Sequence, residues 1–462
     1  MRTLLPLLAL LGCTSAPRTD ADPADEPLDD TADTDDTGDT GGLSDPECAP
    51  VDITAEVTDV TTVVRVRWRT ETPTVGRVDF GKDEAYGLSA PPTEAGTEHE
   101  ALLLGMTADT LVNFRVHTDG ESCSAASGNQ TVTTGSLPSG LFPTRATGTA
   151  SWSGYQVLPL QGTGYAVVIV DNEGHYVWYH QVEASGNLMR AFLSADGKHV
   201  VLCHAGPQDA LQNGKIVKVS LDGAEVTEIP FPYIDHDMVE LPDGSIAAIV
   251  VDGQPEGTAD KIVELRPDGT IVDVWSAWDT WDPDVLGIPE REHNWTHANA
   301  LDYDPVADDY YISLKTMQTL AKIDRATGML EWSMNGVANQ FAFAGGVPVQ
   351  MHHQFEVLDD TILFFENGNP DRGYSRAVEV RFDEEARTAE EIWSYTSDPP
   401  LYVFAKGDVH RFDDGITQVV WSSAGQIQNV SSEGEVVWQL DLDLGQAITF
   451  VQYVPSMYAS QW

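Results

Sequence analysis

The sequence predicts an all-β protein in which a small β-sandwich precedes a six-bladed β-propeller. Three observations favour this fold class. Six copies of a strand, turn and strand pattern start about fifty residues apart in the last three hundred residues, which is the spacing of propeller blades. Short segments of alternating polar and apolar residues precede them, and no stretch has convincing helical periodicity. Of the 462 residues, 42% are apolar, which is enough for one large or two modest cores.

The first residues have the features of an export signal. Residues 1–12 combine a short cationic start with an apolar run of about ten residues, too short to span a bilayer. Leu10-Leu11-Gly12-Cys13 resembles a bacterial lipobox, which implies cleavage before Cys13 and lipidation of that cysteine. Thr14, in place of aspartate, resembles lipoproteins sorted to an outer membrane. We therefore expect a cell-envelope protein that is held on the membrane by its lipid anchor alone.

Residues 13–47 are expected to form a disordered acidic tether that begins with the lipidated cysteine. Thr, Asp, Gly and Pro dominate it, so there is too little apolar surface to offset the entropy cost of ordering. The whole chain has 73 Asp+Glu against 25 Lys+Arg, a net charge of −48. Such a surface repels phosphate backbones and anionic headgroups, which argues against nucleic acid as a partner and against electrostatic membrane binding.

Residues 48–135 are predicted to form the sandwich. Short alternating segments recur there within fewer than a hundred residues, and Trp68 is expected in the core. The stretch is similar to fibronectin type III modules, and residues 136–153 follow it as a linker. Cys48 and Cys123 can either close the first segment onto the last loop or stay unpaired. Cys203 is expected as a buried thiol of the next domain.

Residues 154–462 are predicted to form the propeller. In most copies of the repeat a turn is followed by a strand that ends in an aromatic residue, and the turns centre on Asp171, Asp222, Asp268, Asp324, Asp383 and Ser432. A second repeat precedes the first and is clearest where His236 opens a strand that passes through a tight turn into residues 246–251. We expect this strand to be the innermost one, so that its first residue lies at the mouth of the central channel.

The residue at this first position carries the functional signal. Around the six blades the position is held by Tyr155, Met189, His236, His297, His353 and Gly407. Three of the six are histidine in a chain with only twelve histidines, and ring closure brings them to one axis. Three imidazoles at a channel mouth have two chemical uses. They can hold zinc with an open fourth position, or bind and transfer an anionic group with one imidazole as nucleophile.

Short motifs around these histidines resemble one known family when their order and spacing are taken together. They are His236-Asp with Leu241-Pro-Asp-Gly, His297-x-Asn299 with Asp302-Tyr-Asp304, the run from Ile323 to Trp332, His353 with Phe365-Glu-Asn-Gly368, the run from Tyr374 to Glu379, and Val454 to Tyr458. They resemble the bacterial PAPS-independent arylsulfotransferases over residues 154–458. The resemblance implies an exported six-bladed enzyme that needs no cofactor and acts on small aryl sulfates and phenols.

The resemblance also implies a two-step exchange and a role for each of five residues. His353 would take the sulfuryl group from an aryl sulfate and pass it to a phenol. His236 and His297 would hold the sulfate oxygens, with Asn299 beside them. Lys315 stands where the family has an arginine. It keeps the positive charge but loses the planar fork that grips sulfate at two places, and it is assigned to anion binding.

The choice of His353 over its neighbour His352 rests on register. Leu358 lies five residues after His353, as Leu241 does after His236. Neighbours on a strand face opposite ways, so only one of the pair can enter the channel.

Other polar residues near the channel are assigned more loosely. Tyr155, at a channel position, could orient a phenol or cap the sulfate. Arg376 could line the same opening or brace a blade loop. His204, His293 and His410 are expected to be structural.

Two further functions stay open at this stage. One is a three-histidine metal-dependent hydrolase or lyase, whereas the sulfotransferase interpretation requires no metal. The other is a non-catalytic, surface-displayed binding module that kept the scaffold after losing the arginine. The oligomeric state is left open, a homodimer included.

Overall fold

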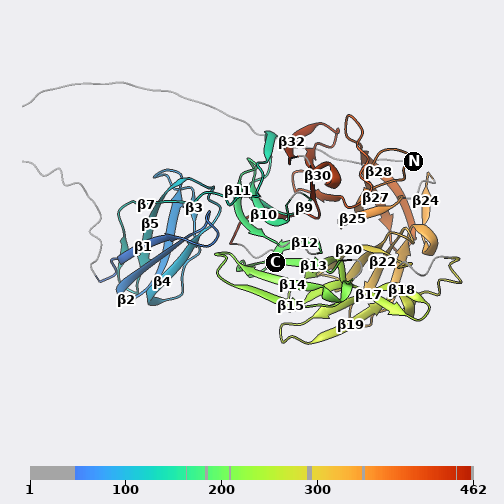
Figure 1. The fold of residues 1–462 in the computed structure, drawn as a ribbon, viewed down its shortest axis with the longest axis horizontal. Coiled ribbons are helices and arrows are strands. Elements are labelled where there is room, and N and C mark those ends of the chain that lie inside the picture. Colours follow the sequence, from blue (N-terminus) through green and yellow to red (C-terminus); the bar gives the residue numbers. More distant parts are fainter. Residues whose placement is uncertain are drawn as a thin grey trace, which may run out of the picture. The chain divides into compact units, whose positions relative to one another are not determined.

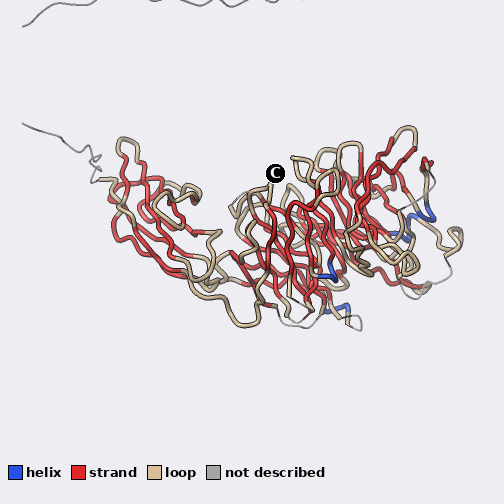
Figure 2. The backbone as a smooth tube through the Cα atoms, turned by 90° about the horizontal axis from the view of Figure 1, so that it is seen from above, coloured by secondary structure: helices blue, strands red, loops and turns tan. Residues whose placement is uncertain are grey.

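The computed structural model describes residues 47–458, apart from residues 163, 183–185, 208–209, 289–293, 346–348 and 444. The predicted signal peptide, the lipidation site Cys13, all but the last residue of the tether, and His293 lie outside the described residues. Strands dominate the described part (Figure 2), and its helical turns are short: η1 (Leu211–Asn213), α1 (Ala277–Thr280), η2 (Gly336–Ala338) and η3 (Ser422–Ala424). No helix within this part has both the length and the apolar character needed to cross a membrane.

Seven strands form the N-terminal part of the described chain. They are β1 (Val51–Val57), β2 (Val64–Gly81), β3 (Leu88–Ser89), β4 (Gly96–Leu103), β5 (Leu111–Asp119), β6 (Ser124–Ala126) and β7 (Gln130–Thr133). The first half of the long strand β2 pairs with β1 and β4, and its second half pairs with β3 and β5. Trp68 is buried in the core of this part, and Cys48 and Cys123 form a disulfide. Its assignment as a fibronectin type III module stays a prediction.

The following strands form the six sheets of a β-propeller, so the predicted six-bladed arrangement is confirmed (Figure 1). Blades 2 to 4 each contain four consecutive strands. They are β12 (Asn187–Leu193), β13 (His199–Ala205), β14 (Lys215–Ser220) and β15 (Val226–Pro230) in blade 2; β16 (Ile234–Glu240), β17 (Ile246–Gln254), β18 (Gly257–Leu265) and β19 (Ile271–Ser276) in blade 3; and β20 (Ala298–Asp304), β21 (Asp309–Leu314), β22 (Thr319–Asp324) and β23 (Leu330–Met334) in blade 4.

Blades 5 and 6 each add a fifth strand at the outer edge. The strands of blade 5 are β25 (His352–Val357), β26 (Thr361–Glu366), β27 (Arg376–Asp383) and β28 (Thr388–Tyr395), with β24 (Ala342–Ala344) parallel to β28. Those of blade 6 are β29 (Asp408–Arg411), β30 (Thr417–Trp421), β31 (Gln426–Val430) and β32 (Val436–Asp441), with β8 (Arg145–Gly148) paired to β32. Because β8 lies within residues 136–153, the segment expected to be a linker contributes a strand to the propeller.

The first strands of blades 2 to 6 contact one another in succession, which makes them the innermost strands. The turns of the sequence repeat join the third and fourth strands of each blade. Tryptophans of the repeat, such as Trp178, Trp332 and Trp438, are at most 1% exposed on the fourth strands. The repeat is therefore visible in the sequence because each blade needs the same turn and the same large apolar side chain between neighbouring sheets.

Blade 1 is built from both ends of the propeller sequence. Its strands β9 (Tyr155–Gly162), β10 (Ala166–Asp171) and β11 (Tyr176–Gln181) are joined by two C-terminal strands, β33 (Gln446–Ile448) and β34 (Gln452–Val454), which both pair with β9. The innermost position of blade 1 is thus occupied by the C-terminal segment. Tyr155 lies on the second strand of its blade, so the prediction that it opens an innermost strand is wrong.

This closure makes a prediction about stability. Ile448 on β33 is fully buried, so Ile448→Ala should lower the free energy of unfolding by about 2–5 kcal/mol through lost apolar burial and a residual cavity. Val436→Ala on the outer strand β32, where the side chain is 45% exposed, should change it by less than about 0.5 kcal/mol. Urea unfolding followed by tryptophan fluorescence measures both, and equal small effects would contradict the closure role.

Candidate active site

A pocket of about 310 Å³ lies where the innermost strands begin. All six blades contribute to it, because each supplies residues at or near the start of its innermost strand. The lining residues are Met189, His236, His297, Asn299, Lys315, His353, Asn367, Phe404, Ala405, Lys406, Thr449 and Phe450. Three histidines, one asparagine and one lysine proposed from the sequence therefore share one pocket.

The three histidines come from blades 3, 4 and 5, and their rings lie close together. The ring centroids of His236 and His297 are 5.0 Å apart, and those of His236 and His353 are 6.4 Å apart. These separations leave the three rings around a space that a small oxyanion can bridge. The chain segments that carry them meet because the innermost strands of these three blades lie next to one another.

Local backbone distortions aim these histidines at the pocket. His236 and His297 have φ values of 51° and 47°, in the left-handed region that costs a residue with a side chain of order 1–3 kcal/mol. The ladder between β16 and β17 shifts register between Ile234 and Met238, and that between β25 and β26 shifts between His352 and Phe355. Such bulges turn a side chain out of its regular alternation, and strain of this kind concentrates at functional sites.

His352 and His353 have different surroundings. The ring of His353 lines the pocket, with its centroid 5.8 Å from that of Phe450. His352 is fully buried, its Nδ1 lies 2.6 Å from the Ser313 hydroxyl, and its carbonyl accepts a hydrogen bond from the Asn299 amide at 3.3 Å. Of the adjacent pair, His353 faces the pocket and His352 braces the neighbouring blade.

A buried carboxylate favours the protonated form of one imidazole in the pocket. Nδ1 of His236 lies 3.0 Å from Oδ1 of Asp235, and both side chains are less than 20% exposed. Burial acts to lower the pKa of His236, but the Asp235 carboxylate more than offsets it, so that the pKa lies above its ordinary value. The same partnership lowers the pKa of Asp235 despite its burial. His236 therefore holds its proton to a higher pH than a free histidine does.

The other two histidines are neutral. Burial, followed by the charges of His236 and Lys315, lowers the pKa of His297 to about 3. Burial, followed by the charges of His236 and His297, holds the pKa of His353 well below its ordinary range. A neutral imidazole keeps a nitrogen lone pair, so His353 can act as a nucleophile at neutral pH.

Asp260 on β18 positions the segment that carries His297. Its carboxylate accepts hydrogen bonds from the Thr296 hydroxyl at 2.6 Å, the Asn294 amide at 2.8 Å and the Ala298 backbone N–H at 2.6 Å. Burial raises the pKa of Asp260 to about 6. Sequence reasoning missed this residue because it lies on a third strand, far in sequence from the histidine that it supports.

Two lysines lie in the pocket, and sequence reasoning found only one of them. Burial lowers the pKa of Lys315, and burial lowers that of Lys406 to about 8. Within the described residues, neither forms an ion pair with a carboxylate. Lys406 was missed because the repeat count puts Gly407 first in its strand. A signal was present in blade 4, where His297 also lines the pocket from just before its strand β20.

Comparison with known proteins identifies the family. The model of the family described as "Arylsulfotransferase (ASST)" matches residues 161–437, more than half of the chain. The chain belongs to the arylsulfotransferase family. A search of curated protein sequences gave no match.

Solved structures that resemble this arylsulfotransferase are distant. A protein of unknown function from Bacteroides caccae is 15% identical, with a TM-score of 0.45 over 65% of this chain and 99% of that one. A streptogramin B lyase is also 15% identical, with a TM-score of 0.39 over 65% of this chain and 88% of that one. A virginiamycin B lyase from Staphylococcus aureus is 13% identical, with a TM-score of 0.34 over 64% of this chain and 74% of that one.

Two residues assigned from the sequence lie outside the histidine pocket. Tyr155 lines a separate recess with Asn172 and Tyr458, because β9 is a second strand rather than an innermost one. The Arg376 guanidinium contacts the Glu366 carboxylate and lies 2.9 Å from Oε1 of Glu391. Arg376 therefore braces blade 5, as one of its two predicted roles has it, and neither residue lines the histidine pocket.

His410 also has a structural setting. Its Nδ1 lies 2.8 Å from Oε1 of Glu356 on the innermost strand of the preceding blade. Cys203 is a free and buried cysteine, as the sequence predicts.

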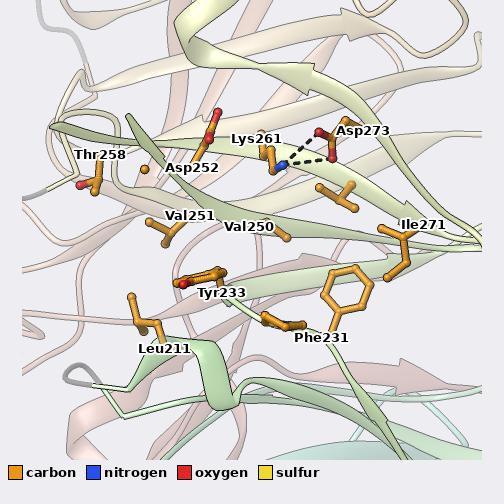
Figure 3. Close-up of a pocket in the computed structure, with 13 residues that line it drawn as sticks. Leu211, Phe231, Tyr233, Val250, Val251, Asp252, Thr258, Lys261, Ile271 and Asp273 are labelled. Atoms are coloured by element: carbon orange, nitrogen blue, oxygen red, sulfur yellow. Dashed lines mark hydrogen bonds and ion pairs between the residues drawn. The ribbon is translucent and has the colours of Figure 1, made fainter. Parts of the chain in front are cut away.

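A larger recess of about 540 Å³ lies between blades 2 and 3 and offers a contrast (Figure 3). Tyr233, Phe231 and Val250 line it, and its one lysine, Lys261, lies 3.0 Å from Oδ2 of Asp273. The charge of Lys261 is neutralised by this carboxylate. The two lysines that line the histidine pocket have no such carboxylate partner in the described chain. The histidine pocket is therefore the better anion site.

The donor geometry does not favour the metal-dependent alternative. In the described part of the chain, two groups of possible metal ligands have their ligand atoms within 4.8 Å of one another. Neither includes a histidine of the pocket, since one is Asp171, Glu173 and His175, and the other is Asp309, Asp324 and Glu331. In the second group, Asp309 and Glu331 already form ion pairs with the ammonium of Lys322.

The ion pair at His236 predicts a pH dependence of anion binding. The proton on His236 favours sulfate, so affinity should fall as pH rises through the raised pKa of this histidine. Asp235→Asn removes the carboxylate that raises the pKa, so the fall should begin at lower pH and sulfate should bind about tenfold more weakly at pH 7. Calorimetric titration with inorganic sulfate between pH 5 and 9 measures this. The exposed turn variant Asp268→Asn is the control, and an unchanged profile in Asp235→Asn would contradict the assignment.

Proposed function

We propose that this arylsulfotransferase moves a sulfuryl group from an aryl sulfate to a phenolic acceptor through a sulfohistidine at His353. One observation carries the proposal. His353, which burial keeps neutral, His236, whose pKa the Asp235 carboxylate raises, and two lysines without carboxylate partners in the described chain share a pocket of about 310 Å³. This combination places a nucleophile and fixed positive charge around the space that one sulfate group fills.

The first half-reaction forms the covalent intermediate. An imidazole nitrogen of His353 donates its lone pair to the sulfur as the bond from sulfur to the phenolic oxygen breaks. The aryloxide takes the electrons of that bond. In the second half-reaction a phenol oxygen attacks the same sulfur and gives up its proton to a base, and the sulfur–nitrogen bond breaks to restore neutral imidazole. The intermediate removes the need to bind two aromatic substrates at once.

The remaining polar residues stabilise the transferred group. His236, as imidazolium, and Lys315 supply positive charge near the sulfate oxygens, and neutral His297 and Asn299 offer hydrogen-bond donors. Sulfuryl transfer is chemically analogous to phosphoryl transfer, in which charge stabilisation and in-line alignment supply most of the catalysis. Because Lys315 lacks the fork of an arginine, the orientation of the sulfate depends on the histidines and Asn299.

We also propose a location in the cell envelope, with Cys13 as the lipid anchor on an outer membrane and residues 48–135 as a fibronectin type III-like module. The lipobox motif and the acidic stretch after it support this location. A labelled fatty acid that enters the wild-type protein but not a Cys13→Ser variant tests the anchor.

The covalent intermediate predicts a mass change on one peptide. Brief exposure to 4-nitrophenyl sulfate should add a labile group of sulfuryl mass to the peptide that contains His352 and His353. His353→Asn should abolish this adduct and lower sulfuryl transfer to phenol by at least about a thousandfold. His352→Asn should retain the adduct, because His352 faces Ser313 rather than the pocket. A persistent adduct in His353→Asn would exclude this nucleophile.

The alternatives give different outcomes in the same assays. A binding module would form no adduct and turn over no aryl sulfate. A metal-dependent hydrolase would contain stoichiometric metal, lose activity on chelation and release inorganic sulfate in place of a sulfated phenol.

The net charge of −48 predicts that salt assists the reaction. An anionic donor is repelled at long range by the acidic surface, and dissolved ions screen this repulsion over about 10 Å at 0.1 M ionic strength. Raising the ionic strength from low values should therefore increase kcat/KM for a sulfated donor. The same titration with viscosity held constant checks that diffusion itself is unchanged, and a flat or falling profile would contradict an anionic substrate.

A further inference from the structure

The pocket has a polar half and an apolar half, and the two halves come from different blades. Blades 3 to 5 supply the histidines with Asn299, Lys315 and Asn367, whereas blades 6, 1 and 2 supply Phe404, Ala405, Thr449, Phe450 and Met189. Lys406 from blade 6 is the one charged residue on the apolar side among the described residues. An aryl sulfate has the same division, because its sulfate is anionic and its ring is apolar.

The position of the donor's bridging oxygen follows if the polar half of the pocket takes the sulfate and the apolar half takes the aromatic ring. With the sulfate among the histidines and the ring against Phe404 and Phe450, the oxygen that joins ring to sulfur lies at the boundary. Lys406 is two residues from Phe404, whose side chain is 70% exposed at the rim. The aromatic contact and the ammonium therefore come from one short segment, residues 404–406.

This segment is held in place by buried polar contacts. The Asn367 side-chain amide donates hydrogen bonds to the carbonyls of Val403 and Lys406, each at 2.8 Å. Lys406 has a left-handed φ of 64°, and His236 and His297 in blades 3 and 4 have left-handed φ values as well. Its ammonium donates to the Gln161 side-chain carbonyl. The Gln161 carbonyl is uncharged, so it positions the ammonium. A carboxylate partner would in addition stabilise the positive charge and oppose loss of the proton.

We propose that Lys406 donates a proton to the phenolic oxygen of the donor and removes the proton from the acceptor phenol. The proposal rests on the proposed sulfuryl transfer and adds a proton carrier to it. In the first half-reaction, the sulfur–oxygen bond breaks and the ammonium of Lys406 protonates the aryloxide, which leaves as a neutral phenol. In the second, the neutral amine takes the proton of the acceptor phenol while its oxygen attacks the sulfur. The amine is ammonium again at the end of the cycle.

The other basic groups of the pocket are less suited to this role. His297 and His353 are not imidazolium at neutral pH, because their pKa values are strongly lowered, so neither has an acidic proton to transfer. His236 is bound to Asp235 within the polar half, and Lys315 belongs to blade 4 in the same half. Burial brings the pKa of Lys406 to about 8, near the operating pH at which a proton carrier is most effective.

A proton donor at this place also indicates a class of donor substrate. Phenols that resemble tyrosine have a pKa of about 10 and are poor leaving groups as anions. Protonation by Lys406 lets such unactivated phenols leave as neutral molecules. We infer that the enzyme uses sulfates of ordinary phenols, and is not restricted to those with electron-withdrawing substituents.

The test compares two donors in matched variants of the full chain. With Lys406→Met, kcat/KM for phenyl sulfate should fall about 10²- to 10⁴-fold, whereas the fall for 4-nitrophenyl sulfate should stay within about tenfold, because 4-nitrophenolate leaves without a proton. Lys406→Arg keeps the charge but cannot release a proton near neutral pH, so it should show the same selective loss. Lys315→Met is the control for charge alone, and it should reduce turnover of both donors by the same factor.

The outcomes separate this role from the function on which it rests. Equal losses for the two donors in Lys406→Met, or near wild-type turnover of phenyl sulfate in Lys406→Arg, would overturn the proton-transfer role. Formation of the sulfuryl adduct from 4-nitrophenyl sulfate in Lys406→Met would show that the variant is folded and that the nucleophile is intact. Absence of the adduct in the wild-type protein would overturn the proposed function itself, and the role of Lys406 with it.

Discussion

The pairing of the C-terminal strands with β9 is the interaction on which the rest of the structure depends. Without β33 and β34, blade 1 would lack its innermost strands and the ring would be open. The pocket draws on all six blades, so it exists only in the closed ring. The C-terminal segment also supplies Thr449 and Phe450 to the pocket wall. The complete pocket therefore forms only when the ring is closed, and no single blade contains the whole site.

Buried carboxylates hold neighbouring blades together at the channel. One oxygen of Asp237 on β16 accepts the Leu301 backbone N–H of the next blade at 3.0 Å, and one oxygen of Asp408 on β29 accepts that of Val451 at 2.7 Å. Burial raises the pKa of both aspartates, that of Asp408 to about 6. Directional bonds of this kind fix the rotation of one blade against the next more strictly than apolar packing does. The histidines that project from the same strands are thereby held at fixed separations.

The sequence predicted the propeller well because blades repeat. Each blade needs the same turn and the same large core residue, so the period survives even where the residues differ. The three histidines were predictable for the same reason, since one position in the repeat reaches the channel. Tyr155 was misplaced because a periodic count assumes that every blade starts at its own innermost strand. The strand that replaces it comes from the far end of the chain, and no local pattern reveals that exchange.

Lys406 and Asp260 were out of reach for different physical reasons. Lys406 reaches the pocket through a left-handed residue just before its strand, and such a distortion shifts the site by one position relative to the regular repeat. Asp260 acts through hydrogen bonds to a segment more than thirty residues away, so only tertiary structure connects the two. Arg376 shows the converse. An arginine near the channel in sequence was a reasonable anion ligand, but Glu366 and Glu391 already satisfy its charge.

The charge distribution is compatible with the proposed binding of sulfate by an acidic protein. With 73 acidic residues in the chain, most basic side chains find a carboxylate partner, as Lys261 and Lys322 do. Burial in the pocket separates Lys315 and Lys406 from the described carboxylates, and it weakens screening by water, so two point charges act strongly over a short range. A pair of lysines on separate blades cannot grip an oxyanion as a planar guanidinium does. Under the proposed function, the direction of the sulfate would come from the histidines, and the left-handed backbone at His236 and His297 fits that role, because it aims both rings into the pocket.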